Sequence, residues 1–145
     1  MRRRKRSAAP GCVLLIILVA AVTAAAWFGV PALAQRNFGE SAEYLKGFPR
    51  WNFSAQTLLH RDDLVTSVSS IGGEIDFSIE SPESISSISR RLEQAGLIND
   101  AAGFRAYLVY KGYDSQIKAG RFKLFTNQNS LEIAESIQAA YSPIV

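Results

Sequence analysis

The chain has little of what disulfide-rich proteins and metal sites depend on. It contains one cysteine, one histidine and one methionine among 145 residues. A lone cysteine, Cys12, excludes an intrachain disulfide, and a lone histidine leaves too few ligands for a closed zinc site. The glycines form neither a P-loop nor a dinucleotide-binding pattern, and no nucleophile motif occurs. We therefore predict no cofactor and no metal.

Positive charge is also scarce once one segment is set aside. The sequence has 16 Lys and Arg against 13 Asp and Glu, but five of the cations lie together at residues 2–6. The other 11 are scattered among the 13 acidic residues, which leaves about −2 for the rest of the chain. Nucleic-acid-binding proteins usually carry a basic stripe. We predict no nucleic-acid partner, and we assign the N-terminal charge to topology and to anionic lipid headgroups.

The most informative feature is an apolar run from Val13 to Val30, interrupted only by Thr23. A helix rises 1.5 Å per residue, so about 20 residues cross the roughly 30 Å hydrocarbon core of a bilayer. Basic residues that flank such a helix stay in the cytoplasm. We predict a cytoplasmic tail at residues 1–10, a single transmembrane anchor at residues 11–34 in the plasma membrane, and an extracytoplasmic remainder. The lipid bilayer is then the first partner.

A cleaved signal peptide is the alternative to this anchor. Ala32, Leu33 and Ala34 form a small-x-small cleavage pattern. Signal peptides usually have apolar regions of about 7–15 residues, which is shorter than the run observed here. We favour a retained anchor. The remainder of the chain is exported on either interpretation.

Residues 35–73 form a predicted juxtamembrane collar and linker. Gly47 and Pro49 are expected to break any long helix there, and residues 54–64 are expected to form a short one. Two interpretations of the aromatic residues remain open: a belt at the depth of the lipid headgroups, or a packed collar beneath the folded domain. The aromatic residues lie within ten positions: Tyr44, Phe48, Trp51 and Phe53.

A half-buried strand is predicted at residues 74–80, where apolar and polar residues alternate. Ser84 is a suitable N-cap for the following helix, whose apolar residues recur at helical spacing. Gly96 is then expected to end that helix as a left-handed C′ residue. The alternation also predicts a sheet with one solvated face.

The second half of the domain repeats these signals. Asn99 is predicted to cap a helix at residues 100–111, and a short strand is expected at residues 121–125. Asn129 has capping-box spacing with Glu132 at the start of a third helix. The predicted fold class is α+β: a single N-terminal transmembrane helix followed by a small β-α-α-β unit with a trailing helix. The two strands should pair antiparallel, with the helices on one face.

The residues from 74 to 140 resemble the LysM-like segment of the MltG (YceG-like) endolytic murein transglycosylases. That family shows an I-A-x-x-L helix, an A-G-(V/L)-I turn, a phenylalanine-bearing helix, A-G-x-Y-x-L and S-x-x-E-I. Ser89 and Phe122 depart from the family's usual alanine and tyrosine. The corresponding stretches are Ile88-Ser-Arg-Arg-Leu92, Ala95-Gly-Leu-Ile98, Phe104, Ala119-Gly-Arg-Phe-Lys-Leu124 and Ser130-Leu-Glu-Ile133.

The resemblance implies a LysM-like domain at residues 74–140 and a short tail at residues 141–145. The family's catalytic domain, with its general-acid glutamate, follows this segment and is not matched. We therefore expect a bacterial membrane-anchored, cell-wall-associated module, the truncated N-terminal part of such an enzyme and inactive by itself. Its further partners would be peptidoglycan glycan strands or a cell-wall enzyme. The alternative is a free-standing membrane-anchored protein-interaction module without glycan binding.

No residue is predicted to be catalytic. Glycan contacts, if any, are assigned to Tyr110 and Tyr113, which lie around the end of the second helix. The alternative, which we favour, is that their rings cover the edge of the small core. The cluster of His60, Asp62 and Asp63 is interpreted as a helix end or loop. The carboxylates of helices, which include Glu93, Glu132 and Glu135, are interpreted as solvated surface residues, because a lytic acid needs a protonated carboxyl in a cleft.

Overall fold

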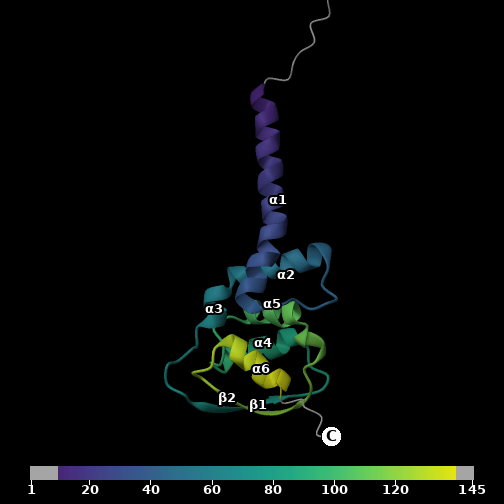
Figure 1. Ribbon diagram of the computed structural model, residues 1–145. Coiled ribbons are helices and arrows are strands. Elements are labelled where there is room, and N and C mark those ends of the chain that lie inside the picture. The colour runs from purple at the N-terminus through teal and green to yellow at the C-terminus, as the bar shows by residue number, and fades with distance from the viewer. Residues whose placement is uncertain (1–9, 140–145) are drawn as a thin grey trace, which may run out of the picture.

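A long apolar helix, α1 (Pro10–Phe38), projects from a body of shorter helices and two strands in the computed structural model, which describes residues 10–139 (Figure 1). The helix is long and apolar enough to cross a membrane, as predicted. Its 29 residues rise about 43 Å, which exceeds the roughly 30 Å of a hydrocarbon core. It also continues beyond residue 34, the predicted end of the anchor. Most of the predicted basic tail and the tail at residues 141–145 lie outside the described residues.

Two helices, α2 (Gly47–Leu59) and α3 (Arg61–Val65), replace the single helix predicted at residues 54–64. Gly47 and Pro49 lie in the first turn of α2, so a helix begins at these residues and none runs through them from the preceding segment, in agreement with the prediction. A proline there costs little, since the first amides of a helix have no partner within it. Figure 1 shows α2 lying across the lower end of α1.

The two strands, β1 (Glu74–Ile79) and β2 (Gly120–Phe125), pair antiparallel with Phe77 opposite Phe122. Phe77 and Ile79 are buried, whereas the alternate residues Asp76 and Ser78 are exposed. The predicted antiparallel pair and its single solvated face are therefore confirmed. The sheet lies at the end of the body farthest from the free end of α1 (Figure 1).

Helix α4 (Ile85–Gln94) begins and ends as predicted. The Ser84 hydroxyl accepts a hydrogen bond from the backbone N–H of Ser87 at 3.2 Å. At the other end Gly96 has a φ of +72°, a conformation that glycine adopts without a Cβ penalty. The N–H groups of Gly96 and Leu97 donate to the carbonyls of Glu93 and Leu92, both at 3.0 Å. This pair of bonds is a Schellman motif.

Helix α5 (Ala101–Lys111) is capped by Asp100, so the prediction of Asn99 as its cap is wrong by one residue. The Asp100 carboxylate accepts from the N–H groups of Ala102 at 3.2 Å and Gly103 at 2.9 Å. Asn99 instead donates through Nδ2 to the Thr66 carbonyl at 2.7 Å. Its role is to hold the loop after α3 against the start of α5.

A short 3-10 helix, η1 (Tyr113–Ser115), follows α5, and α6 (Ser130–Ala139) follows β2. The backbone N–H of Asn129 donates to Glu132 Oε2, and the N–H of Glu132 donates to Asn129 Oδ1, both at 2.9 Å. This reciprocal pair confirms the predicted capping box, with Asn in place of Ser or Thr.

The layers follow one another away from the free end of α1: α2, then α5, then α4 and α6, and finally the sheet (Figure 1). The mixed α and β architecture predicted from the sequence is confirmed, and the order β1-α4-α5-β2 is the expected one. The likeness to a LysM domain stays a prediction. One cluster of buried residues joins these layers, and it includes Ala34, Phe38, Leu64, Phe77, Ile88, Leu92, Leu97, Phe104, Tyr107, Tyr110, Leu124, Ile133 and Ile137.

The lower end of α1 belongs to this core. Ala34 is 0% exposed and Phe38 is 6% exposed, whereas Leu33, on the other side of the helix, is 52% exposed. The Phe38 ring makes edge contacts with Tyr107 and Tyr110, at centroid distances of 5.9 and 6.5 Å. The apolar helix therefore enters the folded body without an intervening linker.

Candidate functional site at the foot of the apolar helix

The chain turns sharply after α1 and returns as α2, and hydrogen bonds from α5 hold the turn in place. Gly39 has a φ of +80°, which favours glycine. Its carbonyl accepts a hydrogen bond from the Tyr110 hydroxyl at 2.8 Å. The Lys111 ammonium donates to the Phe38 carbonyl at 3.3 Å, and the N–H of Ala42 donates to the Tyr110 carbonyl at 2.7 Å. These bonds fix the turn after α1 against the end of α5.

Three aromatic rings stack where α2 crosses α1. The Trp51 ring lies between Trp27 and Phe48, with centroid distances of 6.5 and 6.1 Å. The Trp51 Nε1–H donates to the backbone carbonyl of Ala26 at 3.1 Å. Trp27 and Phe48 nevertheless remain 45% and 62% exposed, and neighbouring Phe28 is 75% exposed. We call Trp27, Phe28, Phe48 and Trp51 the aromatic collar.

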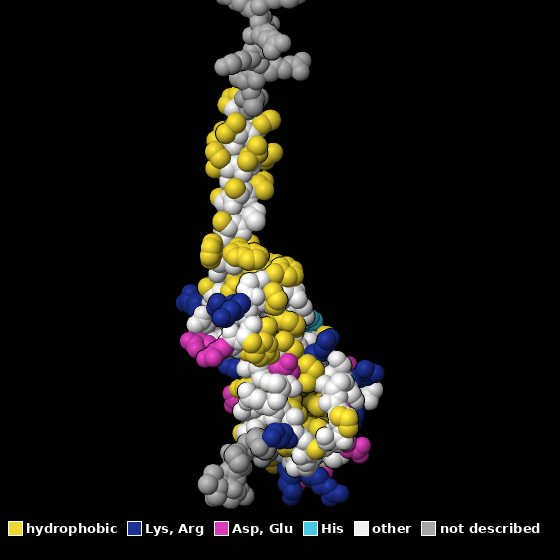
Figure 2. All heavy atoms as spheres, turned by 90° about the vertical axis from the view of Figure 1, so that its right-hand side faces the viewer, with side chains coloured by type: hydrophobic (Ala, Val, Ile, Leu, Met, Phe, Trp, Pro, Cys, Tyr) yellow, Lys and Arg dark blue, Asp and Glu magenta, His cyan; other side chains and the backbone are white. Residues whose placement is uncertain are grey.

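The aromatic collar stands apart from the hydrophobic core, because none of its four residues belongs to the buried cluster or to the side chains packed against it. Figure 2 shows yellow side chains that continue from α1 onto the top of the body, with Lys and Arg directly beneath them. Of the two aromatic residues predicted in the same segment, Phe53 packs against the core, whereas Tyr44 is 58% exposed. The exposure of the aromatic collar favours the first interpretation, a belt of exposed rings, over the second, in which the rings are packed beneath the domain.

The aromatic collar borders a cavity of about 280 Å³ between α1 and α2. Its walls include Trp27, Phe28 and Pro31 on the apolar side and Arg50 and Gln35 on the polar side. A second cavity of about 220 Å³ shares Arg50 and Gln35 with the first. Tryptophan and arginine side chains are typical of the membrane interface, because one end is apolar and the other is polar.

The predicted polar cluster at His60 is brought together with a residue that sequence reasoning did not include. His60 Nδ1 lies 2.5 Å from Asp100 Oδ2, and Asp63 places a carboxylate within 4.8 Å of both groups. The Asp62 side chain points to solvent and is 97% exposed. Because both Asp100 oxygens already accept backbone N–H groups of α5, this cluster is best explained as a helix cap that joins α3 to α5.

Gly103 allows the start of α5 to lie close to His60, because glycine has no side chain. A Cβ atom at Gly103 would lie 2.6 Å from the His60 Cβ and 2.9 Å from Asp100 Oδ2. His60 is 40 residues or more from Asp100 and Gly103 in the sequence, so no local pattern reveals its contact with them. The interpretation of His60 as part of a helix end agrees with its position between α2 and α3.

Tyr110 is buried, which favours the interpretation of its ring as part of the core over its assignment as a glycan contact. Its side chain is 1% exposed, because the ring packs under α1 and its hydroxyl is bonded to Gly39. It therefore offers no surface to a sugar. Tyr113 is half-buried and meets the buried Tyr107 ring edge-on at 6.4 Å. Burial raises the pKa of both Tyr110 and Tyr113 above the ordinary value.

A groove of about 500 Å³ lies at the opposite end of the body, between the β1–α4 turn and the loop that precedes β2. Its walls combine polar residues, Glu80, Ser81 and Lys118, with apolar ones such as Pro82. The groove was not predicted, because its two walls are separated by more than thirty residues of sequence.

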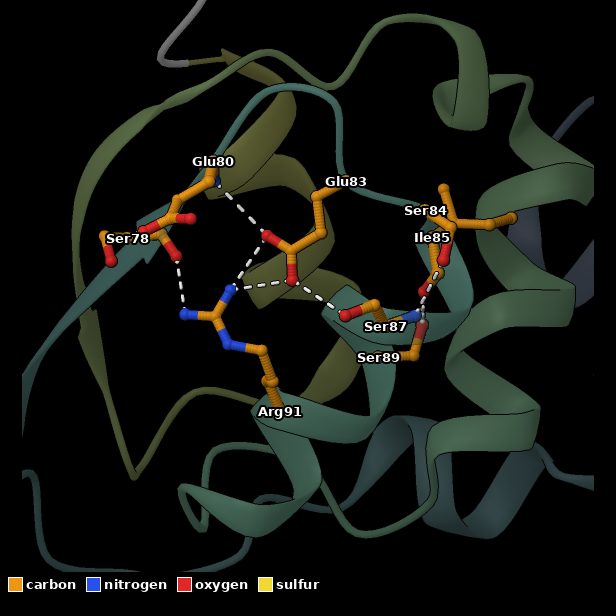
Figure 3. A network of polar contacts seen from close by, with 8 residues as sticks. All are labelled: Ser78, Glu80, Glu83, Ser84, Ile85, Ser87, Ser89 and Arg91. Carbon is orange, nitrogen blue, oxygen red and sulfur yellow. Dashed lines mark hydrogen bonds and ion pairs between the residues drawn. The ribbon is translucent and has the colours of Figure 1, made fainter.

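A polar network fixes the turn that forms one wall of this groove (Figure 3). Both Glu83 oxygens accept from Arg91 Nη1, at 2.7 and 2.8 Å, and Oε1 also accepts from the Ser87 hydroxyl at 2.9 Å. Arg91 Nη2 donates to the Ser78 carbonyl at 2.8 Å, and its guanidinium lies over the Phe77 ring.

The same network sets the charge of Glu83. Burial raises the pKa of the Glu83 carboxyl, but hydrogen bonds from Arg91, Ser87 and the backbone N–H of Glu80 outweigh that effect and hold the pKa below its ordinary value. A carboxylate held in this way is ionised at neutral pH, so it is unsuited to act as a general acid.

The carboxylates considered for lytic chemistry lie on the surface. Glu93, Glu132 and Glu135 are all exposed. Glu93 accepts from the N–H of Ala101 at 2.6 Å, and Glu132 completes the capping box of α6. Their interpretation as solvated surface residues is confirmed by their exposure.

Comparisons of the chain with protein-family models, with curated proteins and with solved structures found no match. Function is therefore inferred from the residues of this chain.

Proposed function

We propose that this chain is a single-span membrane protein that presents a non-catalytic domain at the outer surface of the plasma membrane. The observation that carries the proposal is the double role of α1. Its upper part is apolar and exposed, whereas Ala34 and Phe38 at its foot are buried in the domain core. The five cations at residues 2–6 favour a cytoplasmic N-terminus.

The continuity of α1 also favours a retained anchor over a cleaved signal peptide. Cleavage after Ala34 would remove that residue from the core and leave Phe38 only four residues from a free end. The span, the aromatic collar and the domain then form one rigid unit, so the domain lies directly against the headgroup region. N-terminal sequencing of the mature protein tests this point, and a chain that begins at Gln35 would contradict it.

For the domain itself we propose association with the cell wall, as in the non-catalytic part of the transglycosylases that residues 74–140 resemble. The β1-α4-α5-β2 order and the polar groove beside Ser81 support this proposal. The strands β1 and β2, which lead to the two walls of the groove, lie at the far end of the body from the free end of α1 (Figure 1), so a polymer could reach the groove while the aromatic collar contacts lipid.

A sedimentation assay with insoluble peptidoglycan tests the wall association. The full chain in detergent is the appropriate sample, because the foot of α1 is part of the core. We expect weak retention that decreases for Ala119→Trp, which fills the groove, and not for Gln94→Trp, which is exposed at the end of α4. No retention of the unaltered chain would favour the alternative, a protein-interaction module without glycan binding.

A further inference from the structure

The two cavities at the foot of α1 differ in chemistry and meet at Arg50. The cavity next to the aromatic collar has apolar walls formed by Trp27, Phe28 and Pro31. The second cavity is lined by Glu40, Glu43 and Lys46. Arg50 lies in the wall of both.

Arg50 is available to a ligand. Its side chain is exposed, and it forms no salt bridge or hydrogen bond with any other residue between 10 and 139. A guanidinium group can donate two parallel hydrogen bonds to a phosphate. Since Trp27 and Phe28 extend the apolar surface of α1, a phosphate at Arg50 would lie at the level of the lipid headgroups.

The apolar wall is therefore followed by Arg50 and then by an outer cavity that carries the two carboxylates. Glu40 and Glu43 contribute two negative charges to the outer cavity, and Lys46 and Arg50 contribute two positive charges, so its formal balance is zero, as in a zwitterionic headgroup. A phospholipid with a primary ammonium presents the complementary order: an acyl chain, a phosphate and then a cation with N–H donors.

We propose that this surface binds a zwitterionic phospholipid of the phosphatidylethanolamine class. The phosphate pairs with Arg50, the primary ammonium donates hydrogen bonds to Glu40 or Glu43, and an acyl chain lies against Trp27 and Phe28. The inference rests on the proposed function, because it requires the aromatic collar to lie at the membrane surface.

The two acidic residues determine the choice among lipids. An anionic glycerol headgroup carries no cation that can donate hydrogen bonds to Glu40 and Glu43. A choline headgroup has a cation but no N–H to donate to a carboxylate. Both of these lipids can place a phosphate on Arg50, so the preference among the three must come from the outer cavity.

Tryptophan fluorescence reports on this site alone, because Trp27 and Trp51 are the two tryptophans of the chain and both belong to the aromatic collar. The full chain is reconstituted in phosphatidylcholine bilayers that contain equal amounts of a second lipid brominated on its acyl chain. Quenching by brominated ethanolamine, glycerol and choline lipids gives their relative exchange constants. An exposed ion pair contributes about two- to fivefold, and we expect an ethanolamine preference of that size over choline.

Matched variants assign the preference to residues. The double variant Glu40→Gln and Glu43→Gln should bring the ethanolamine-to-choline ratio close to one, whereas Arg50→Gln should weaken all three lipids alike, because each can place a phosphate there. Arg121→Gln, at an exposed position on the outer face of the sheet, should leave the ratio unchanged.

The remaining outcomes separate the two proposals. Equal quenching by all three lipids, or a preference for the glycerol lipid, would overturn the lipid assignment while leaving the aromatic collar at the membrane. A preference that survives in the Glu40 and Glu43 double variant would overturn it too. Absence of quenching by every brominated lipid would refute the membrane position of the aromatic collar, and with it the proposed function.

Discussion

Replacing Phe38 with alanine tests whether the apolar helix is a structural part of the domain or only a tether. Phe38 is 6% exposed, and its ring makes edge contacts with Tyr107 and Tyr110. Truncation of a buried phenylalanine costs about 3–5 kcal/mol, which includes the cavity left behind. A small domain has a total stability of only about 5–15 kcal/mol. Phe38→Ala should therefore remove a large share of the free energy of unfolding.

The assay is thermal unfolding of the full chain in detergent, followed by near-ultraviolet circular dichroism of the aromatic side chains. Each kcal/mol lowers the melting temperature of a domain of this size by at least about 4 °C, so the loss should be about 12 °C or more. Leu33→Ala is the control, because Leu33 lies on the same helix but is 52% exposed. Equal, small shifts for both variants would show that α1 only tethers the domain, and our description of the core would be wrong.

Four further predictions concern topology, acid stability, a buried hydroxyl and activity. A reporter fused after Val145 should be active only outside the cytoplasm; cytoplasmic activity would reverse the proposed orientation. The depressed pKa of Glu83 stabilises the fold at pH values above the unfolded pKa near 4.5. This contribution is lost as the pH falls through the lower folded pKa. Unfolding free energies measured from pH 5 to pH 3 should thus fall more steeply for the unaltered chain than for Glu83→Gln, and parallel curves would contradict the network in Figure 3. Ser54→Ala should raise the stability by about 1 kcal/mol in denaturant titrations, because the buried Ser54 Oγ has no hydrogen-bond partner in the described part of the chain; Ser89→Ala, which breaks a 2.6 Å bond to the Ile85 carbonyl, should not. The full chain incubated with peptidoglycan should release no anhydro-muropeptides by mass spectrometry, and such products would reopen the assignment of an acid.

Local signals in the sequence were sufficient for the parts of the fold that depend on a few neighbouring residues. The apolar run from Val13 predicted a helix long enough to cross a membrane, and alternation predicted β1. Ser84 and Gly96 mark the two ends of α4 as expected, since a capping residue forms hydrogen bonds with amides or carbonyls within a few positions of itself. The Asn129 capping box is confirmed for the same reason.

Only the tertiary structure decided which residues of these elements are buried. The burial of Tyr110 depends on Gly39, which is 71 residues away in the chain. The identity of the α5 cap depends on the loop after α3, which holds Asn99 and leaves the capping position to Asp100. The foot of α1 joins the core because α2 folds back across it, and no pattern within an apolar helix distinguishes residues that face lipid from residues that face a domain. The meeting of Arg50 with Trp27, Glu40 and Glu43 has the same origin, because it is created by the turn between two helices.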